Sequence, residues 1–161
     1  NMSRAFTIYV RPLLEYCSTV WNPYHKSNIQ MIENVQRKFT RRIFGFKKIS
    51  YDERLKRLNM STLELRRLQN DLSMMYQIIR DKTPLEKSDY FTLCATNTRA
   101  RNSFKCLQTQ YRTNSRKFDI STRWVHVWNS LPEYIVNSPN VCVFRKKLIK
   151  IDLSAHLSGG V

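Results

Sequence analysis

Apolar residues recur every three or four positions through most of the first eighty residues, which is the spacing of amphipathic α-helices. Ser27, Ser50 and Ser61 each stand three residues before a Glu or Gln, a pattern typical of helix N-termini. Pro12 lies inside the first periodic segment and predicts either a kink or a helix start there. We therefore predict helices over four ranges in this part of the chain: 5–19, 28–44, 51–58 and 62–82.

The pattern changes after residue 83. Residues 90–118 contain six bases and no acid, and they are rich in Thr, Asn, Ser and Gln. Weak alternation of apolar and polar residues over 104–111 and 117–120 allows one short β-hairpin. Helical spacing returns over 121–129 and 141–153, so the second half also contains helices.

These elements predict a mainly α fold, a helical bundle followed by a small C-terminal subdomain. The last eight residues end in Ser, two Gly and Val, and we expect them to be frayed. The predicted organisation has three parts: a helical region over 1–83, a basic C-terminal extension over 84–153 and a tail over 154–161.

The helix predicted over 28–44 is both apolar and cationic, and a helical wheel separates most of the two properties. Five apolar residues share an arc of roughly 120°, namely Ile29, Ile32, Val35, Phe39 and Ile43. Four bases lie outside this arc or at its border, namely Arg37, Lys38, Arg41 and Arg42. Phe44 is the exception, because it falls opposite Val35 at the end of the helix. The arc has the width of a core contact, so we predict that the Val35 side faces inward and that the bases face water.

The bases on this helix are poorly balanced by acids. From residue 37 to 57 the chain has nine bases and two acids. Arg37 with Arg41, and Lys38 with Arg42, are like-charged pairs four residues apart, which destabilise a helix. Three interpretations compete: a solvated surface, contact with an anionic membrane, and contact with phosphates. Trp and Leu do not dominate the apolar arc as they do in many membrane-surface helices, so we favour phosphates.

Composition strengthens this preference. The chain has 161 residues, 28 Lys and Arg, and 12 Asp and Glu, for a formal net charge of +16. Such a charge repels itself, and an anionic partner relieves the repulsion. Apolar residues make up 42% of the chain, enough for a core, so the sequence is not that of a disordered basic tail.

The sequence offers little sign of metal binding, membrane insertion or catalysis. The four cysteines are scattered without a C-x-x-C pair, and the three histidines have no ligand spacing to them, so we expect reduced thiols. No apolar run reaches the ~18 residues of a membrane span, and no signal-peptide pattern opens the chain. We expect an intracellular protein of nucleus and cytoplasm. With three glycines and no recognisable nucleophile set, we expect no autonomous catalytic site.

Three blocks in the same order resemble the region that follows the polymerase palm in reverse transcriptases of non-LTR retrotransposons, the LINE-like and jockey-like elements. The first is RPLLEYCSTVWNPYHKSNIQMIENVQRKFTRRI, with matches at Arg11, Pro12, Leu14, Glu15, Tyr16, Trp21, Pro23, Ile32, Glu33, Val35, Gln36, Arg37, Phe39 and Thr40. The second is SYDERLKRLNMSTLELRRLQNDLSMMYQII, with matches at Tyr51, Glu53, Arg54, Leu55, Arg66, Arg67, Asp71, Leu72 and Tyr76. The third is RWVHVWNSLPEYIVNSPNVCVFRKKL, with matches at Arg123, Trp128, Asn129, Leu131, Pro132, Val136, Phe144 and Leu148.

The resemblance implies a thumb-like helical region and a C-terminal extension of an RNA-directed DNA polymerase. In that family the metal-binding aspartates lie in a Tyr-x-Asp-Asp turn upstream of the position of Arg11. No such turn occurs in this chain, so we do not expect it to be active alone. The divalent metal is expected in the missing palm, and no cofactor is expected here. The implied partners are the upstream palm and fingers together with RNA, RNA–DNA hybrid or DNA.

The function we expect is therefore non-catalytic: the chain grips template RNA or an RNA–DNA hybrid by its phosphates. The alternative is a retroelement-derived structural or protein-interaction domain that docks an acidic partner. The candidate nucleic-acid-binding residues are Arg37, Lys38, Arg41, Arg42, Lys47, Lys48, Arg99, Arg101, Lys105, Arg112 and Arg116.

Overall fold

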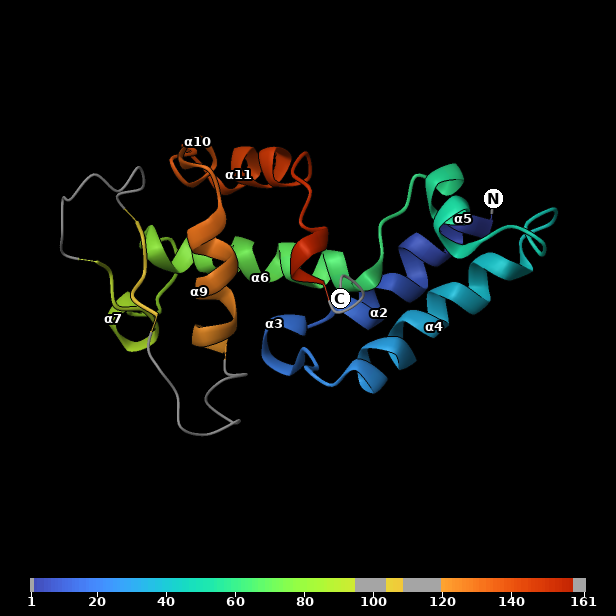
Figure 1. The fold of residues 1–161 in the computed structure, drawn as a ribbon, viewed down its shortest axis with the longest axis horizontal. Coiled ribbons are helices and arrows are strands. Elements are labelled where there is room, and N and C mark those ends of the chain that lie inside the picture. Colours follow the sequence, from blue (N-terminus) through green and yellow to red (C-terminus); the bar gives the residue numbers. More distant parts are fainter. Residues whose placement is uncertain (1, 95–103, 109–119, 158–161) are drawn as a thin grey trace. The chain divides into compact units, whose positions relative to one another are not determined.

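The computed structural model describes residues 2–94, 104–108 and 120–157, and it confirms a mainly α-helical fold (Figure 1). No strand is formed within these three ranges. Contacts between α-carbons divide the chain into two compact units. Unit 1 contains Asn1–Leu68 with Leu157–Val161, and unit 2 contains Gln69–His156. This division falls fifteen residues before the boundary at 83/84 that the composition suggested.

Unit 1 is built from short helical segments, one long helix and the start of a second long helix. The elements are α1 (Met2–Ala5), the π-helix η1 (Phe6–Val10), α2 (Arg11–Glu15), α3 (Ser18–Trp21), α4 (Lys26–Arg42), α5 (Tyr51–Leu58) and the first turns of α6 (Leu63–Ile79). The rings of Phe6 and Phe39 stack at 4.5 Å between centroids, which joins η1 to α4.

The single helix predicted over 5–19 is broken into shorter pieces. The N–H of Arg11 donates to the carbonyl of Phe6, five residues back, so the turn before Pro12 is wide. A proline ring crowds the carbonyl four residues before it, and a wide turn relieves this clash. A second break occurs at Cys17, whose φ of 49° is left-handed and interrupts the helix before α3.

The three predicted capping sites have different outcomes. Ser50 caps α5 as predicted, because its Oγ accepts a hydrogen bond from the Glu53 N–H at 3.3 Å. No side chain caps α4, which begins one residue before Ser27. At the start of α6, Thr62 takes the role predicted for Ser61, and its Oγ1 accepts from the Leu65 N–H at 3.2 Å.

The predicted inward face of α4 is wrong at its centre. Val35 is 40% exposed, whereas the buried positions form a line along the helix. These positions are spaced by four, three and four residues, and three of the four are polar: Ile29, Glu33, Gln36 and Thr40. A hydrogen-bond network, described below, explains why this polar line faces inward.

Unit 2 packs the rest of α6 against helices from the end of the chain. Its other elements are α7 (Lys87–Tyr90), α9 (Ile120–Ser130), α10 (Glu133–Val136), α11 (Val141–Leu148) and the 3-10 turn η2 (Ser154–His156). Tyr76 of α6 stacks on Phe144 of α11 at 4.5 Å, and Trp128 of α9 lies 6.0 Å from the same Phe144 ring. Phe144 and Leu148 lie four residues apart on one face of α11, and both are fully buried.

The buried face of α6 contains apolar residues at helical spacing and one arginine. Leu68, Leu72 and Met75 recur every three or four residues, and all three are buried. Arg67 is also fully buried. Its Nε donates to Asn22 Oδ1 at 3.0 Å within unit 1.

Of the predicted hairpin, residues 109–119 lie outside the described part of the chain, and within that part Cys106 forms an antiparallel bridge with Leu93. The Cys94 N–H donates to the Lys105 carbonyl at 2.9 Å. Asn129 of α9 holds the same strip, because its side chain exchanges hydrogen bonds of 3.0 and 2.8 Å with the backbone of Cys106. Most of the second predicted strand, over 117–120, lies outside the described residues.

We predict that Cys106 resists alkylation in the native protein. Burial, with a smaller effect of neighbouring Cys94, raises the pKa of the Cys106 thiol to about 12, so the reactive thiolate is rarely formed at pH 8. Cys17 and Cys142 are exposed and should react with iodoacetamide within minutes to hours. Peptide mass spectrometry measures both rates, with guanidinium-unfolded protein as the control. Equal labelling of Cys106 and Cys17 in the native protein would contradict this packing.

Candidate nucleic-acid interface

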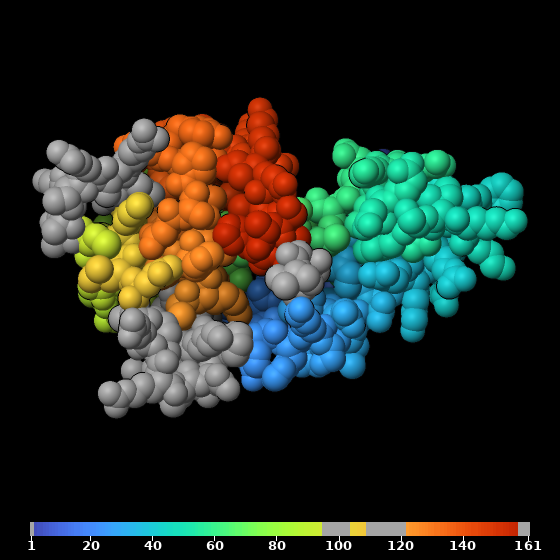
Figure 2. Space-filling model, viewed as in Figure 1, coloured from blue at the N-terminus to red at the C-terminus, as the bar shows by residue number. Residues whose placement is uncertain are grey.

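The candidate site begins where α4 ends, in a tight turn that contains Phe44. The Phe46 N–H donates to the carbonyl of Ile43 at 3.0 Å, which closes a four-residue turn. Gly45, at its third position, has a φ of +80°, the geometry of a type II turn, which favours glycine. Phe44 occupies the corner of the turn and is 100% exposed. The segment projects from the end of α4 in Figure 1, and its turquoise atoms lie on the surface seen in Figure 2.

Four bases surround this turn and line one groove with it. The groove has a volume of about 630 Å³. Its basic residues are Lys38, Arg41, Arg42 and Lys47, and all four are exposed. Ile43, Phe44 and Gly45 complete the lining, so the groove combines apolar and cationic residues.

Neutralisation of these bases by the chain's own acids is not observed. Within the described residues, no carboxylate forms an ion pair with any of the four. Two acids of unit 1 have other partners: Glu15 pairs with Arg66, and Glu53 pairs with Arg57 at 3.0 Å. The groove therefore carries an excess of positive charge that is available to an external anion.

The helix dipole explains part of this arrangement, but not all of it. Arg41 and Arg42 lie in the last turn of α4, where the partial negative charge of a helix C-terminus favours cations. That effect is confined to the last turn, so it does not account for Lys47 in the loop. It also gives no reason for a fully exposed Phe44 between the bases.

Arg37 lies apart from the groove. Its guanidinium carbon is 4.5 Å from the centroid of the Tyr51 ring, a cation–π contact. It lines a separate, smaller cavity of about 210 Å³ together with Glu33, Tyr51 and Asp52. Arg37 thus contributes positive charge beside the groove while its side chain packs against α5.

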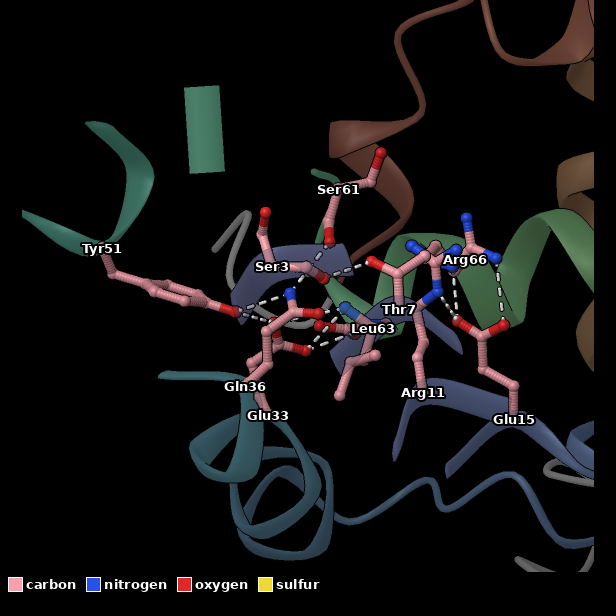
Figure 3. Close-up of polar contacts among 11 residues, drawn as sticks. Ser3, Thr7, Arg11, Glu15, Glu33, Gln36, Tyr51, Ser61, Leu63 and Arg66 are labelled. Atoms are coloured by element: carbon pink, nitrogen blue, oxygen red, sulfur yellow. Dashed lines mark hydrogen bonds and ion pairs between the residues drawn. The ribbon is translucent and has the colours of Figure 1, made fainter. Parts of the chain in front are cut away.

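The Glu33 carboxylate holds α4 in place by joining it to the N-terminus of α6 and to α5 (Figure 3). Its Oε2 accepts from the backbone N–H groups of Leu63 at 2.9 Å and Glu64 at 3.3 Å. The Tyr51 hydroxyl donates to Oε1 of the same carboxylate. Because the first N–H groups of a helix have no partner within it, a buried carboxylate at this position is well stabilised.

Gln36 extends this network by one turn of α4. Its Nε2 donates to the Tyr51 hydroxyl at 3.0 Å and to the Ser61 carbonyl at 2.9 Å. Burial, followed by the hydrogen bond to Glu33, raises the pKa of Tyr51 above its ordinary value, so this hydroxyl stays protonated and donates.

A second ionic contact ties the N-terminal helices to α6 within unit 1 (Figure 3). Glu15 makes two hydrogen bonds with the Arg66 guanidinium, and the one between Nη2 and Oε2 measures 3.0 Å. Arg11 approaches the same carboxylate at 3.9 Å. Desolvation and the neighbouring Arg66 charge lower the pKa of Arg11, an effect that Glu15 partly opposes.

The other predicted site residues fall in different places. Lys48 is exposed one residue beyond the groove lining. Lys105 is half-buried in unit 2, and its carbonyl takes part in the bridge described above. Four predicted residues lie outside the described part of the chain: Arg99, Arg101, Arg112 and Arg116. The structure therefore brings together four predicted bases, Lys38, Arg41, Arg42 and Lys47, at the end of α4. A nucleic-acid-binding role for the residues after position 84 stays a prediction.

Phe44 is the site residue that the wheel analysis did not assign. Its isolated position opposite Val35 and the glycine that follows it were the available signals. In the structure, Phe44 lies in the turn that Gly45 permits, and its side chain is fully exposed.

The described part of the chain shows neither a group of metal ligands nor a helix that could span a membrane. In ranges 2–94, 104–108 and 120–157, no three His, Cys, Asp or Glu side chains are grouped closely enough to hold a metal ion. None of the helices in the described ranges has both the length and the apolar character needed to cross a bilayer.

Comparison with known proteins finds a partial match to a nematode protein. The chain is similar to the uncharacterized protein B0403.1 of Caenorhabditis elegans, with 29% identity over 79 residues. The match covers 47% of this chain and 40% of the relative, so it spans about two fifths of the relative's length. No family model matches the chain, and no solved structure matches it.

We predict that Glu33→Gln and Tyr51→Phe each lower the free energy of unfolding by about 1.5–3 kcal/mol, because each removes a hydrogen bond that involves a buried charge. Urea unfolding followed by circular dichroism measures the change. Asn34→Ala, at an exposed position on the same helix, is the control and should change stability by less than about 0.5 kcal/mol. If Glu33→Gln were as stable as this control, the carboxylate would not hold α4 in place.

Proposed function

We propose that this chain is a non-catalytic, nucleic-acid-binding region of a retroelement reverse transcriptase, and that it grips template RNA or an RNA–DNA hybrid by its phosphates. The observation that carries the proposal is the groove at the end of α4, where four exposed bases have no carboxylate partner in the described residues. The order of the three sequence blocks supplies the polymerase context.

The arrangement favours binding to the nucleic-acid backbone. Lys38, Arg41 and Arg42 extend from one end of a helix, and Lys47 extends from the adjoining loop. Cations of this kind bind phosphates irrespective of sequence, as a copying enzyme requires. Lys38, Arg41 and Arg42 lie on a helix that the Glu33 hydrogen bonds hold in place, and Lys47 lies in the loop that follows it. This limits how far the backbone at these bases moves when an anion binds.

A second feature fits a protein partner such as the polymerase palm. Large apolar side chains on the N-terminal segments are between 73% and 78% exposed: Tyr9, Leu13, Tyr16 and Val20. Along the sequence, each of these four side chains is three or four positions from the next. Exposed apolar groups gathered in one segment mark protein contacts more often than chance.

Binding to RNA should depend steeply on salt. If the four groove bases neutralise about four phosphates, log affinity falls against log salt with a slope of about −3 to −4. In the variant Lys38→Gln/Arg41→Gln/Arg42→Gln, three of the four contacts are removed, and the slope should fall to about −1. Fluorescence anisotropy of a labelled RNA at several salt concentrations measures both slopes.

The matched control has the same loss of charge in unit 2. Arg145→Gln/Lys146→Gln/Lys150→Gln removes three exposed bases outside the groove and should leave the slope near that of the original chain. A slope near zero for the original chain, or no binding at low salt, would refute nucleic-acid binding. An equal effect of the two triple variants would show general electrostatic attraction in place of a site.

The second candidate function is a retroelement-derived interaction domain that docks an acidic protein. The exposed apolar residues of the N-terminal segments favour this alternative, because nucleic-acid phosphates do not need them. The groove variant distinguishes the two functions. Loss of an acidic protein partner in a pull-down, with unchanged RNA binding, would support the interaction domain.

A further inference from the structure

Phe44 is fully exposed, which sets it apart from the other phenylalanines described in unit 1. It is 100% exposed, whereas buried Phe6 stacks on half-buried Phe39. Burying a side chain of this size removes apolar surface from water and stabilises a protein. An aromatic ring left wholly in water contributes no such stabilisation to the fold, and its whole surface is open to a ligand.

The turn holds the ring in the groove among the bases. Gly45 adopts a φ of +80° with no atom within 4 Å of the position a Cβ would occupy, so backbone conformation rather than crowding requires glycine there. The Phe46 N–H to Ile43 carbonyl bond fixes the two ends of the turn. The turn thereby fixes the backbone position of Phe44, which lines the same groove as Arg41, Arg42 and Lys47.

We propose that Phe44 is a stacking platform for an unpaired base, so that the groove at the end of α4 prefers single-stranded nucleic acid over duplex. This inference rests on the proposed nucleic-acid binding and refines the class of substrate. Cations that hold a backbone, combined with an exposed aromatic ring that stacks a base, are the two elements of single-strand binding. In a duplex the base faces are already stacked, so the ring gains no partner there.

Charge complementarity selects this occupant over an apolar protein segment. The groove walls carry four positive charges around one aromatic ring, and a nucleotide offers an anionic phosphate and a flat aromatic base in one unit. An anionic membrane surface offers negative charge without a stacking partner, and the experiment below tests it separately.

The test compares Phe44→Ala and Phe44→Trp with the original chain. The ligands are a labelled twelve-nucleotide oligo(U), the matching oligo(dT) and a twelve-base-pair RNA duplex. Phe44→Ala should weaken single-strand binding by roughly fivefold to a hundredfold, the equivalent of ~1–3 kcal/mol per stacked base. Its duplex affinity and its salt slope should not change, because no charge is removed. The oligo(U) and oligo(dT) arms show whether the sugar matters.

Phe44→Trp should retain single-strand affinity and add a fluorescence signal that is quenched when a base stacks on the indole. Tyr134→Ala is the matched control, since Tyr134 is 61% exposed and does not line the groove. It should bind both ligands as the original chain does.

The outcomes separate the two proposals. Unchanged oligo(U) binding by Phe44→Ala, or equal loss for strand and duplex, would overturn the stacking role while leaving phosphate binding intact. Absence of binding to every nucleic acid by the original chain would overturn both. Phe44-dependent binding to vesicles of 70% phosphatidylcholine and 30% phosphatidylserine, with RNA binding independent of Phe44, would reassign the ring to a membrane surface.

Discussion

The orientation of α4 depends on one buried carboxylate. Glu33 is an anion in a chain of net charge +16, and no arginine or lysine neutralises it directly in an ion pair among the described residues. Its stabilisation comes from two backbone N–H groups at the start of α6 and from the Tyr51 hydroxyl. Because a buried charge without such partners is very costly, these donors determine which side of α4 faces inward.

This constraint also determines where the bases point. At about 100° per residue, Lys38 and Arg42 lie roughly opposite the line of Glu33, Gln36 and Thr40. They therefore face water once that line is buried. The exposed groove is thus a geometric consequence of the internal hydrogen bonds, although no groove base takes part in them. The bases were correctly expected to be exposed even though the reason given, an inward Val35, was wrong.

The local elements were the predictable part of the fold. The bounds of α5 and the buried face of α11 follow from periodicity and from one Ser–Glu cap, all of which depend on residues close together in the sequence. The inward face of α4 was not predictable in this way. Its polar residues find partners at Tyr51, Ser61 and Leu63, between 15 and 30 residues away, and a wheel contains no information about them. The position of Phe44 could not be read from the wheel either. Phe44 lies in the turn that follows α4, and a helical wheel does not describe a turn.

The location of the unit boundary inside α6 bears on gene truncation. The C-terminal half of this helix provides Tyr76, against which the Phe144 ring stacks, and Leu72, which is fully buried. Arg80, just after the helix, donates to the Val136 carbonyl at 2.9 Å. An open reading frame that started after residue 83 would encode α9, α10 and α11 without the scaffold on which they assemble. Such a product would not fold and would be degraded by proteases. The smallest part of unit 2 that can fold when it is moved to another gene therefore has to include α6.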